Sequence, residues 1–167
     1  GLFARVMLAR TITKPGLLRM PAVFDRLDIR FEYPENWKLE EDSADAAESS
    51  TGQVIVSSPE TAFWQLSKHP QDVELELLFD EALRTLRSLY EEIEAEPMRE
   101  TMEQTEIEGF NVSFYCLDFT NTCWLRGFET PEATYLLLCQ AEDREFQKTG
   151  PVFLAMLASV LRNLRAK

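Results

Sequence analysis

The fold is decided by residues 100–140, which read ETMEQTEIEGFNVSFYCLDFTNTCWLRGFETPEATYLLLCQ. Apolar and polar residues alternate through most of this stretch, and a period of two is typical of β-strands. Three breaks in the alternation predict turns, at Gly109, at Thr120–Asn121 and at Thr130–Pro131–Glu132. We therefore expect four consecutive antiparallel strands, with the most apolar of them, 134–140, near the centre of the sheet.

Shorter extended segments precede this stretch and are expected to enlarge the same sheet. Residues 27–33 alternate and predict a half-buried strand that Pro34 ends. Further strands are expected at 53–57 and 61–67, joined by a turn at 58–60. The intervening segment 40–52 is rich in Asp, Glu, Ser and Ala and predicts a mobile acidic loop without the residue spacing of a calcium-binding loop.

Two amphipathic helices are expected beside the sheet. The first begins at the N-cap Asp72, repeats apolar residues every three or four positions from Leu75 to Ile93, and ends before Pro97. After Ala141 the chain is expected to turn helical, with a turn or two at 142–148. The second long helix then begins at Pro151, after Gly150, and runs to the end of the chain. Two helices on an antiparallel sheet of six or seven strands belong to the α+β class.

A chain of 167 residues is most simply one domain, which we place at 21–167. Residues 1–20 are basic and contain no acid. We expect them to form an arm or extension that is either disordered or exchanged onto a neighbouring molecule. A homodimer therefore stays an open alternative.

The formal net charge of −12 argues against nucleic acids as partners. It repels the phosphates of nucleic acids, which are bound by Lys and Arg, and it favours a basic protein partner. No apolar run approaches the roughly 18 residues that a membrane span needs, so no membrane span is expected. The sequence given shows no export signal, which favours a cytoplasmic location.

Residues that could support catalysis or bind a metal are few. Cys116, Cys123 and Cys139 are odd in number and show no C-x-x-C spacing, which is typical of buried free thiols in a reducing compartment. The single histidine, His69, lies far from them in sequence and is expected at the surface. No nucleophile is paired with a base, so we expect no metal, no cofactor and no enzymatic activity.

The segment Phe31-Glu32-Tyr33-Pro34-x-x-Trp37 resembles the opening of PsbP-like domains. Over about 27–165, the expected order of elements is similar to that family, which includes photosystem II PsbP, the Ran-binding Mog protein, DcrB-type bacterial proteins and adaptor chaperones for type VI secretion effectors. The resemblance implies an α/β/α sandwich. It carries over no catalytic residues, because these relatives are mostly binding or assembly proteins.

The sequence thus favours a non-enzymatic protein-binding or assembly module. The expected partner contacts are the carboxylates of the acidic loop, namely Glu40, Glu41, Asp42 and Asp45. One alternative is an adaptor chaperone for a secreted effector, which requires an exposed apolar groove. Another is an enzyme or small-ligand-binding protein, which requires a deep pocket with convergent polar groups.

Overall fold

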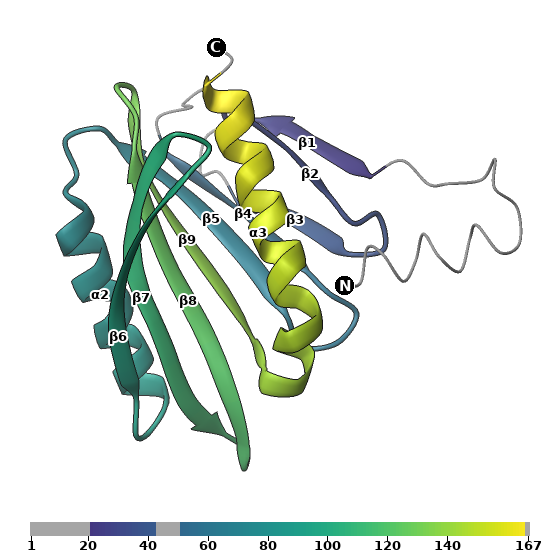
Figure 1. Cartoon of the computed structure of the whole chain (residues 1–167), viewed down its shortest axis with the longest axis vertical. Coiled ribbons are helices and arrows are strands. Elements are labelled where there is room, and N and C mark those ends of the chain that lie inside the picture. Colours follow the sequence, from purple (N-terminus) through teal and green to yellow (C-terminus); the bar gives the residue numbers. More distant parts are fainter. Residues whose placement is uncertain (1–20, 43–50, 166–167) are drawn as a thin grey trace, which may run out of the picture.

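The computed structural model describes residues 21–42 and 51–165 of the chain (Figure 1). Its main element is a seven-stranded antiparallel sheet with the order β3-β4-β5-β9-β8-β7-β6. The α+β class is therefore confirmed, and the most apolar predicted strand lies at the centre. The strands of this sheet are β3 Lys38–Asp42, β4 Gly52–Ser57, β5 Phe63–Pro70, β6 Glu94–Met102, β7 Thr105–Cys116, β8 Phe119–Glu129 and β9 Ala133–Glu142.

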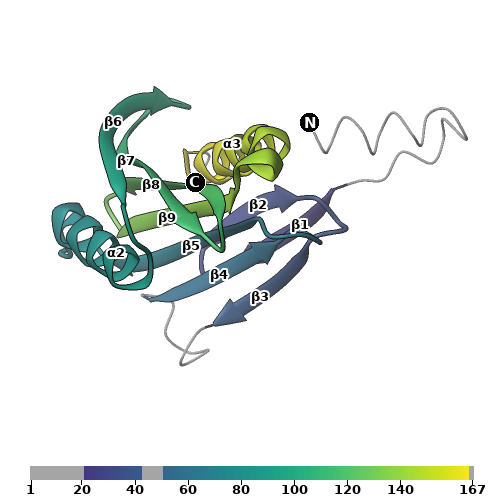
Figure 2. The same ribbon diagram turned by 90° about the horizontal axis from the view of Figure 1, so that it is seen from below.

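Two helices of the described chain lie on opposite faces of the sheet, which gives the layered arrangement expected from the sequence. Helix α2, Leu75–Leu89, packs on Leu125, Leu136 and Leu138, and we call this side the α2 face. Helix α3, Asp143–Arg165, packs on the other side, the α3 face. The sheet curls around α3, while α2 lies on the outside of the curve (Figure 2).

The segment predicted as one strand, 27–33, is instead part of a separate hairpin. Strands β1, Ala22–Arg26, and β2, Ile29–Tyr33, form their own two-stranded sheet. Leu27 and Asp28 make the turn between them, both with φ of +59°. The hairpin packs on the α3 face, where the Phe31 ring lies 4.8 Å from the ring of Trp64, so its apolar side is buried without joining the main sheet.

Two of the three predicted turns of residues 100–140 are wrong. The first turn is at Glu103–Gln104 and the second at Leu117–Asp118, and all four residues have positive φ. The turn at Thr130–Pro131–Glu132 is confirmed. Positive φ at both central residues is the geometry of a two-residue type I′ hairpin turn, which usually carries Asn or Gly.

Gly109 lies inside β7 opposite Arg126, and close backbone approach explains the glycine. A Cβ atom built on it would overlap the carbonyl oxygen of Leu125. Gly127 on β8 has a different neighbour, because its Cβ would lie 2.6 Å from Leu75 Cδ2 and 2.7 Å from Phe79 Cζ. Gly109 therefore allows β7 and β8 to lie close together, and Gly127 allows α2 to pack close to the sheet.

The first helix is shorter than predicted at both ends. Its N-cap is Glu74 rather than Asp72, and it ends at Leu89 because Tyr90 is extended, with its ring stacked 4.1 Å from that of Phe114. Pro97 does not end the helix but lies in the edge strand β6. An edge strand tolerates proline, because one of its sides makes no ladder hydrogen bonds.

The second helix begins eight residues before the predicted start, so Gly150 and Pro151 lie inside α3. The added first turns bury the ring of Phe146, which lies 4.6 Å from Trp124 and 5.4 Å from Phe153. This burial offsets the backbone hydrogen bond that a proline within a helix removes.

Two sequence predictions fall outside the described residues, namely the arm at 1–20 and the site residue Asp45. The predicted loop 40–52 is wrong at its start, because Glu40, Glu41 and Asp42 belong to strand β3. Its residues 43–50 lie outside the described residues. Neither α2 nor α3 is both long and apolar enough to cross a bilayer, and the same holds for the whole described part of the chain.

Glu145 connects the start of α3 to the turn between β4 and β5 by hydrogen bonds. Its carboxylate accepts hydrogen bonds from the Ser58 hydroxyl at 2.5 Å, the Thr61 hydroxyl at 2.5 Å and the Thr61 backbone N–H at 2.8 Å. Burial alone would raise the pKa of Glu145, but these hydrogen bonds outweigh burial and lower the pKa below its ordinary value of 4.5.

The two sheet glycines should differ in their tolerance of a methyl group. We expect Gly127→Ala to lower the free energy of unfolding by about 1–3 kcal/mol, because the ends of the Leu75 and Phe79 side chains can shift. Gly109→Ala should cost more, because the carbonyl it meets belongs to the paired backbone. Urea unfolding of both variants measures the difference, and an equal or larger loss for Gly127→Ala would contradict this account of Gly109.

A lowered pKa makes Glu145 a source of acid sensitivity. Its contribution to stability is full above its unfolded-state pKa and disappears as the pH falls through the lower folded-state pKa. We expect Glu145→Gln to reduce the free energy of unfolding at pH 7 by about 1–3 kcal/mol. The gap to the parent protein should close as the pH falls through the lowered pKa of Glu145, whereas Glu60→Gln, an exposed change in the same turn, should cost no stability at pH 7.

Candidate functional site

Helix α2 covers only part of its face of the sheet, and a hollow lies on each side of it. One hollow, of about 430 Å³, lies between α2 and strands β4, β5 and β9. The other, of about 480 Å³, lies between α2 and strands β6 and β7. Open surface beside a helix is a common place for ligands and partner segments to bind.

We call the first hollow the amide groove, after the side chains of Gln53, Gln65 and Gln140 on its strand side. Leu86 and Leu89 line its helix side. The three glutamines point to the α2 face because residues alternate along strands β4, β5 and β9. The groove therefore combines an apolar wall with a polar floor.

Hydrogen bonds within the floor hold its side chains in place. The Gln65 amide nitrogen donates to the Gln53 side-chain oxygen at 3.1 Å, and the Ser67 hydroxyl donates to the backbone oxygen of Leu136 at 3.3 Å. Gln140 Nε2 lies 3.5 Å from the hydroxyl of Tyr90, which links β9 to the end of α2.

His69 lies half-buried in this groove, although the sequence suggested a surface position. Its Nε2 atom is 2.9 Å from the Ser67 hydroxyl oxygen. Burial lowers the pKa of His69 below 6.5, and the Glu81 carboxylate opposes part of that change. The Ser67 hydroxyl oxygen also lies 3.3 Å from the Leu136 backbone oxygen, and the tautomer of His69 determines which of the two side chains donates to the other.

The sheet continues the groove toward its β3 edge. Glu40 lies beside Ile55, which lies beside Gln65, and Asp42 lies beside Gln53 in the same way. Cross-strand neighbours share a face of the sheet. We call Glu40 and Asp42 the acidic edge, because their exposed carboxylates border the same open face as the amide groove.

The structure thus divides the four acids predicted from the sequence. Glu40 and Asp42 come together on the α2 face, with Glu40 3.1 Å from Lys38 Nζ. Glu41 alternates to the other face, where Arg26 Nε donates to its carboxylate at 2.8 Å. Asp45 lies outside the described residues.

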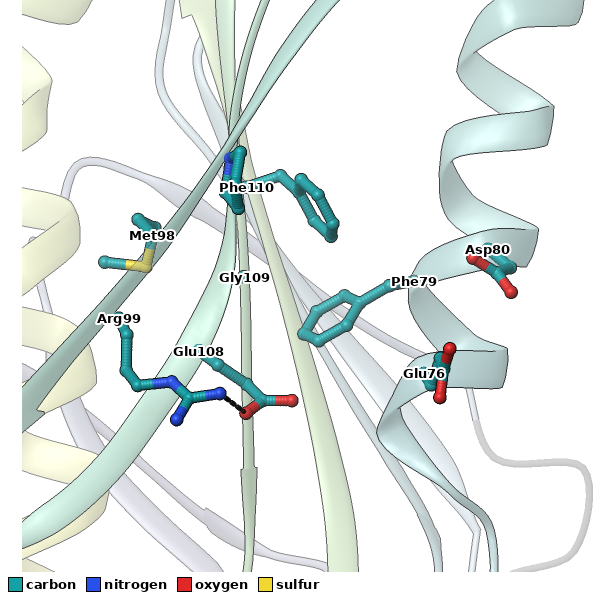
Figure 3. A pocket seen from close by; sticks show the side chains of 9 residues that line it. Glu76, Phe79, Asp80, Met98, Arg99, Glu108, Gly109 and Phe110 are labelled. Carbon is teal, nitrogen blue, oxygen red and sulfur yellow. Dashed lines mark hydrogen bonds and ion pairs between the residues drawn. The ribbon is translucent and has the colours of Figure 1, made fainter.

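The second hollow, the aromatic pocket, was not found from the sequence. Phe79 of α2 and Phe110 of β7 point toward each other across it, with ring centroids 5.6 Å apart and planes at 78° (Figure 3). Gly127 leaves room for the Phe79 ring. The remaining lining residues are Glu76, Asp80, Pro97, Met98, Arg99, Glu108 and Gly109.

Charges surround the aromatic rings unevenly. Glu76 and Asp80 lie one turn apart on α2 and are both exposed, while Glu108 projects from β7. Arg99 of β6 is the basic residue of the lining, and its Nη2 atom lies 3.4 Å from the Glu108 carboxylate. The sequence carried no signal for this pocket, because its lining residues are brought together only by the pairing of β6 with β7.

Neither hollow offers a metal site. Within residues 21–42 and 51–165, no group of three or more His, Cys, Asp or Glu side chains could hold a metal ion.

Comparison with known proteins gives similarity of fold alone. No family model matches the chain, and no curated protein sequence matches it. A solved structure of a Bacteroides thetaiotaomicron protein is similar with a TM-score of 0.55 at 12% identity; the match covers 83% of this chain but only 48% of that one, so the present chain spans about half its length.

Two other similar structures have lower scores. The cyanobacterial PsbP of Synechocystis matches with a TM-score of 0.49 at 10% identity, over 84% of this chain and 89% of that one. A protein of unknown function from Pseudomonas aeruginosa matches with a TM-score of 0.47 at 9% identity, over 84% and 96%.

The single histidine provides a direct test of the groove geometry. We expect the His69 pKa, measured from its ring protons by NMR, to lie below 6.5, and Glu81→Gln to lower it further because a neighbouring carboxylate is lost. Asp80→Asn faces the aromatic pocket and should leave that pKa unchanged. A His69 pKa that does not respond to Glu81→Gln would mean that the two side chains do not share the groove.

Proposed function

We propose that this protein is a non-enzymatic protein-binding module, and that the amide groove and the acidic edge together hold a segment of another protein. The observation that carries this proposal is that apolar, amide and acidic side chains follow one another across one open face of the sheet. Apolar side chains beside α2 are followed by amides on β4 and β5, and then by carboxylates on β3.

The apolar part of this surface supports a protein ligand. Leu89 is 64% exposed at the end of α2. Leu136 and Leu138 are only half-buried, although they lie on the central strand of the sheet. A central strand is normally dry, so uncovered apolar groups at this position favour a partner that covers them.

The amide part suits the backbone of a bound segment. Gln53, Gln65 and Gln140 each carry a donor and an acceptor, which is the same pair of groups that a peptide bond presents. Amide side chains can therefore pair with an extended chain whatever its side chains are. The apolar wall and the acidic edge would then select among sequences.

The charges indicate a basic partner. Glu40 and Asp42 lie at one end of the surface, and Glu81 lies on the helix side. The whole chain carries a net charge of −12, which attracts basic proteins over a long range at low salt. The segment that fits best is therefore amphipathic, with Lys or Arg near its apolar residues.

The reactive side chains support a role without catalysis. Burial raises the pKa of Cys123 to about 12 and raises that of Cys139 well above 9.0, so both thiols stay protonated. The thiolate is the nucleophilic form of cysteine. Free buried thiols are also typical of a reducing compartment, which supports the proposed cytoplasmic location.

An adaptor chaperone for an apolar helix is the second candidate function. One observation favours it, namely the uncovered apolar groups of Leu89, Leu136 and Leu138 beside α2. Such a chaperone would bind apolar segments without basic residues, and its affinity would change little with salt.

Selection from a random peptide display library with the full chain tests the proposal. We expect the selected peptides to be rich in Lys or Arg next to Leu, Ile or Phe, and to bind about tenfold more weakly when salt is raised from 50 to 500 mM. The double variant Glu40→Gln with Asp42→Asn should weaken binding about three- to tenfold at low salt, and Leu89→Ser should weaken it at any salt.

The matched control is Glu94→Gln with Glu96→Gln, which removes the same charge from the exposed edge strand β6. It should leave the affinity almost unchanged. Selected peptides that are purely apolar and insensitive to salt would favour the chaperone. Peptides whose affinity is unaffected by Leu89→Ser and by the acidic-edge variant would refute the proposed surface.

A further inference from the structure

We propose that the aromatic pocket is a second binding site, which takes the guanidinium or ammonium group of a basic side chain from a partner protein. The pocket lies on the opposite side of α2 from the amide groove, so this site is independent of the proposed function. The argument uses the aromatic rings, the surrounding carboxylates and the way in which this chain already holds its own arginines.

Phe79 is buried, so the ring that can offer an apolar surface to an alkyl chain and a π surface to a cation is that of Phe110. Phe79 and Phe110 are 5.6 Å apart in an edge-to-face arrangement, which leaves one aromatic face free of the other ring. Phe110 is only half-buried, so part of its surface remains accessible (Figure 3). Aromatic faces attract Lys and Arg cations that lie within about 6 Å of the ring.

The carboxylates set the sign of the ligand charge. Glu76, Asp80 and Glu108 line the pocket, and Arg99 is the single basic residue of the lining. Glu76 and Asp80 are four residues apart on α2, a spacing at which like charges repel each other. A cation between them would relieve that repulsion, whereas an anion would add to it.

The chain's own arginines show how such a ligand would be held. On the α3 face, the Arg126 guanidinium lies 5.0 Å from the centre of the Trp124 ring and donates to the side-chain oxygen of Asn111 at 2.7 Å. At the aromatic pocket, Arg99 reaches Glu108 from the edge but remains 75% exposed. Arg99 therefore competes only weakly with a cationic ligand for the Glu108 carboxylate.

Titration of the full ¹⁵N-labelled chain with n-butylguanidinium tests the site, and neutral n-butylurea of nearly the same shape is the matched ligand. We expect butylguanidinium to shift the Gly109 and Phe110 amide signals saturably, with a Kd on the order of 1–10 mM, as befits a small ligand. Butylurea should bind at least about fivefold more weakly, and added salt should weaken only the cation.

Neighbouring acids on α2 give matched variants. Asp80→Asn should weaken butylguanidinium binding about two- to fivefold, whereas Glu81→Gln removes the same charge on the side of the amide groove and should have no effect. Arg99→Gln should strengthen binding about two- to fivefold, because Glu108 loses its internal partner. A purely structural pocket would not respond to these variants in opposite directions.

The proposal is overturned if the Gly109 and Phe110 signals do not shift saturably, or if butylurea shifts them as strongly as butylguanidinium. It is also overturned if Asp80→Asn and Glu81→Gln weaken binding equally, since general attraction to an acidic protein would then explain the result. Peptides selected for the amide groove are a separate readout. They can fail to bind while the aromatic pocket still binds butylguanidinium, and they can bind while the pocket does not.

Discussion

Strand β9 lies in the middle of the sheet with apolar side chains on both faces. Leu137 and Cys139 point toward α3, and Leu136 and Leu138 point toward α2. A strand of this kind must be covered twice, because neither of its faces can be left to water without losing the free energy of apolar burial. One strand therefore accounts for a helix on each side of the sheet.

The two covers differ in completeness. On the α3 face, a helix of 23 residues and the β1–β2 hairpin lie side by side. Polar groups between them are also paired, since the Ser159 hydroxyl accepts from the Glu32 backbone N–H and the Asn163 amide donates to the Arg30 backbone oxygen. A buried group left without such a partner would be costly, so these hydrogen bonds help to hold the hairpin against α3.

Local patterns predicted most of the strands, though not β1, and the two amphipathic helices, because burial alternates with the period of each element. They failed at the turns for a physical reason. Leu117–Asp118, Leu27–Asp28 and Glu103–Gln104 all have positive φ yet contain no glycine, so they lack the Asn-Gly or Asp-Gly pair that identifies such turns in a sequence. Gly109 was misread because a glycine needed for close approach of two strands looks, in sequence, like a glycine needed for a turn.

The binding surfaces were harder to predict than the strands, because they depend on register. The sequence identified an acidic cluster, but alternation along β3 separates Glu41 from Glu40 and Asp42, and only the pairing of β3, β4 and β5 joins those two acids to the amides. Phe79 and Phe110 are 31 positions apart and have no pattern in common. Such sites become visible only after the strands are aligned.

Helix α2 finally explains why two surfaces of different chemistry lie so close together. A single helix is only about 10–12 Å wide, so α2 cannot cover a seven-stranded sheet and leaves open surface on both sides. Successive residues of a helix point about 100° apart, so Asp80 borders the aromatic pocket while Glu81 borders the amide groove. One short helix thereby buries the centre of the sheet and also supplies lining side chains to both hollows. A longer or second helix would bury more apolar surface, but it would close them.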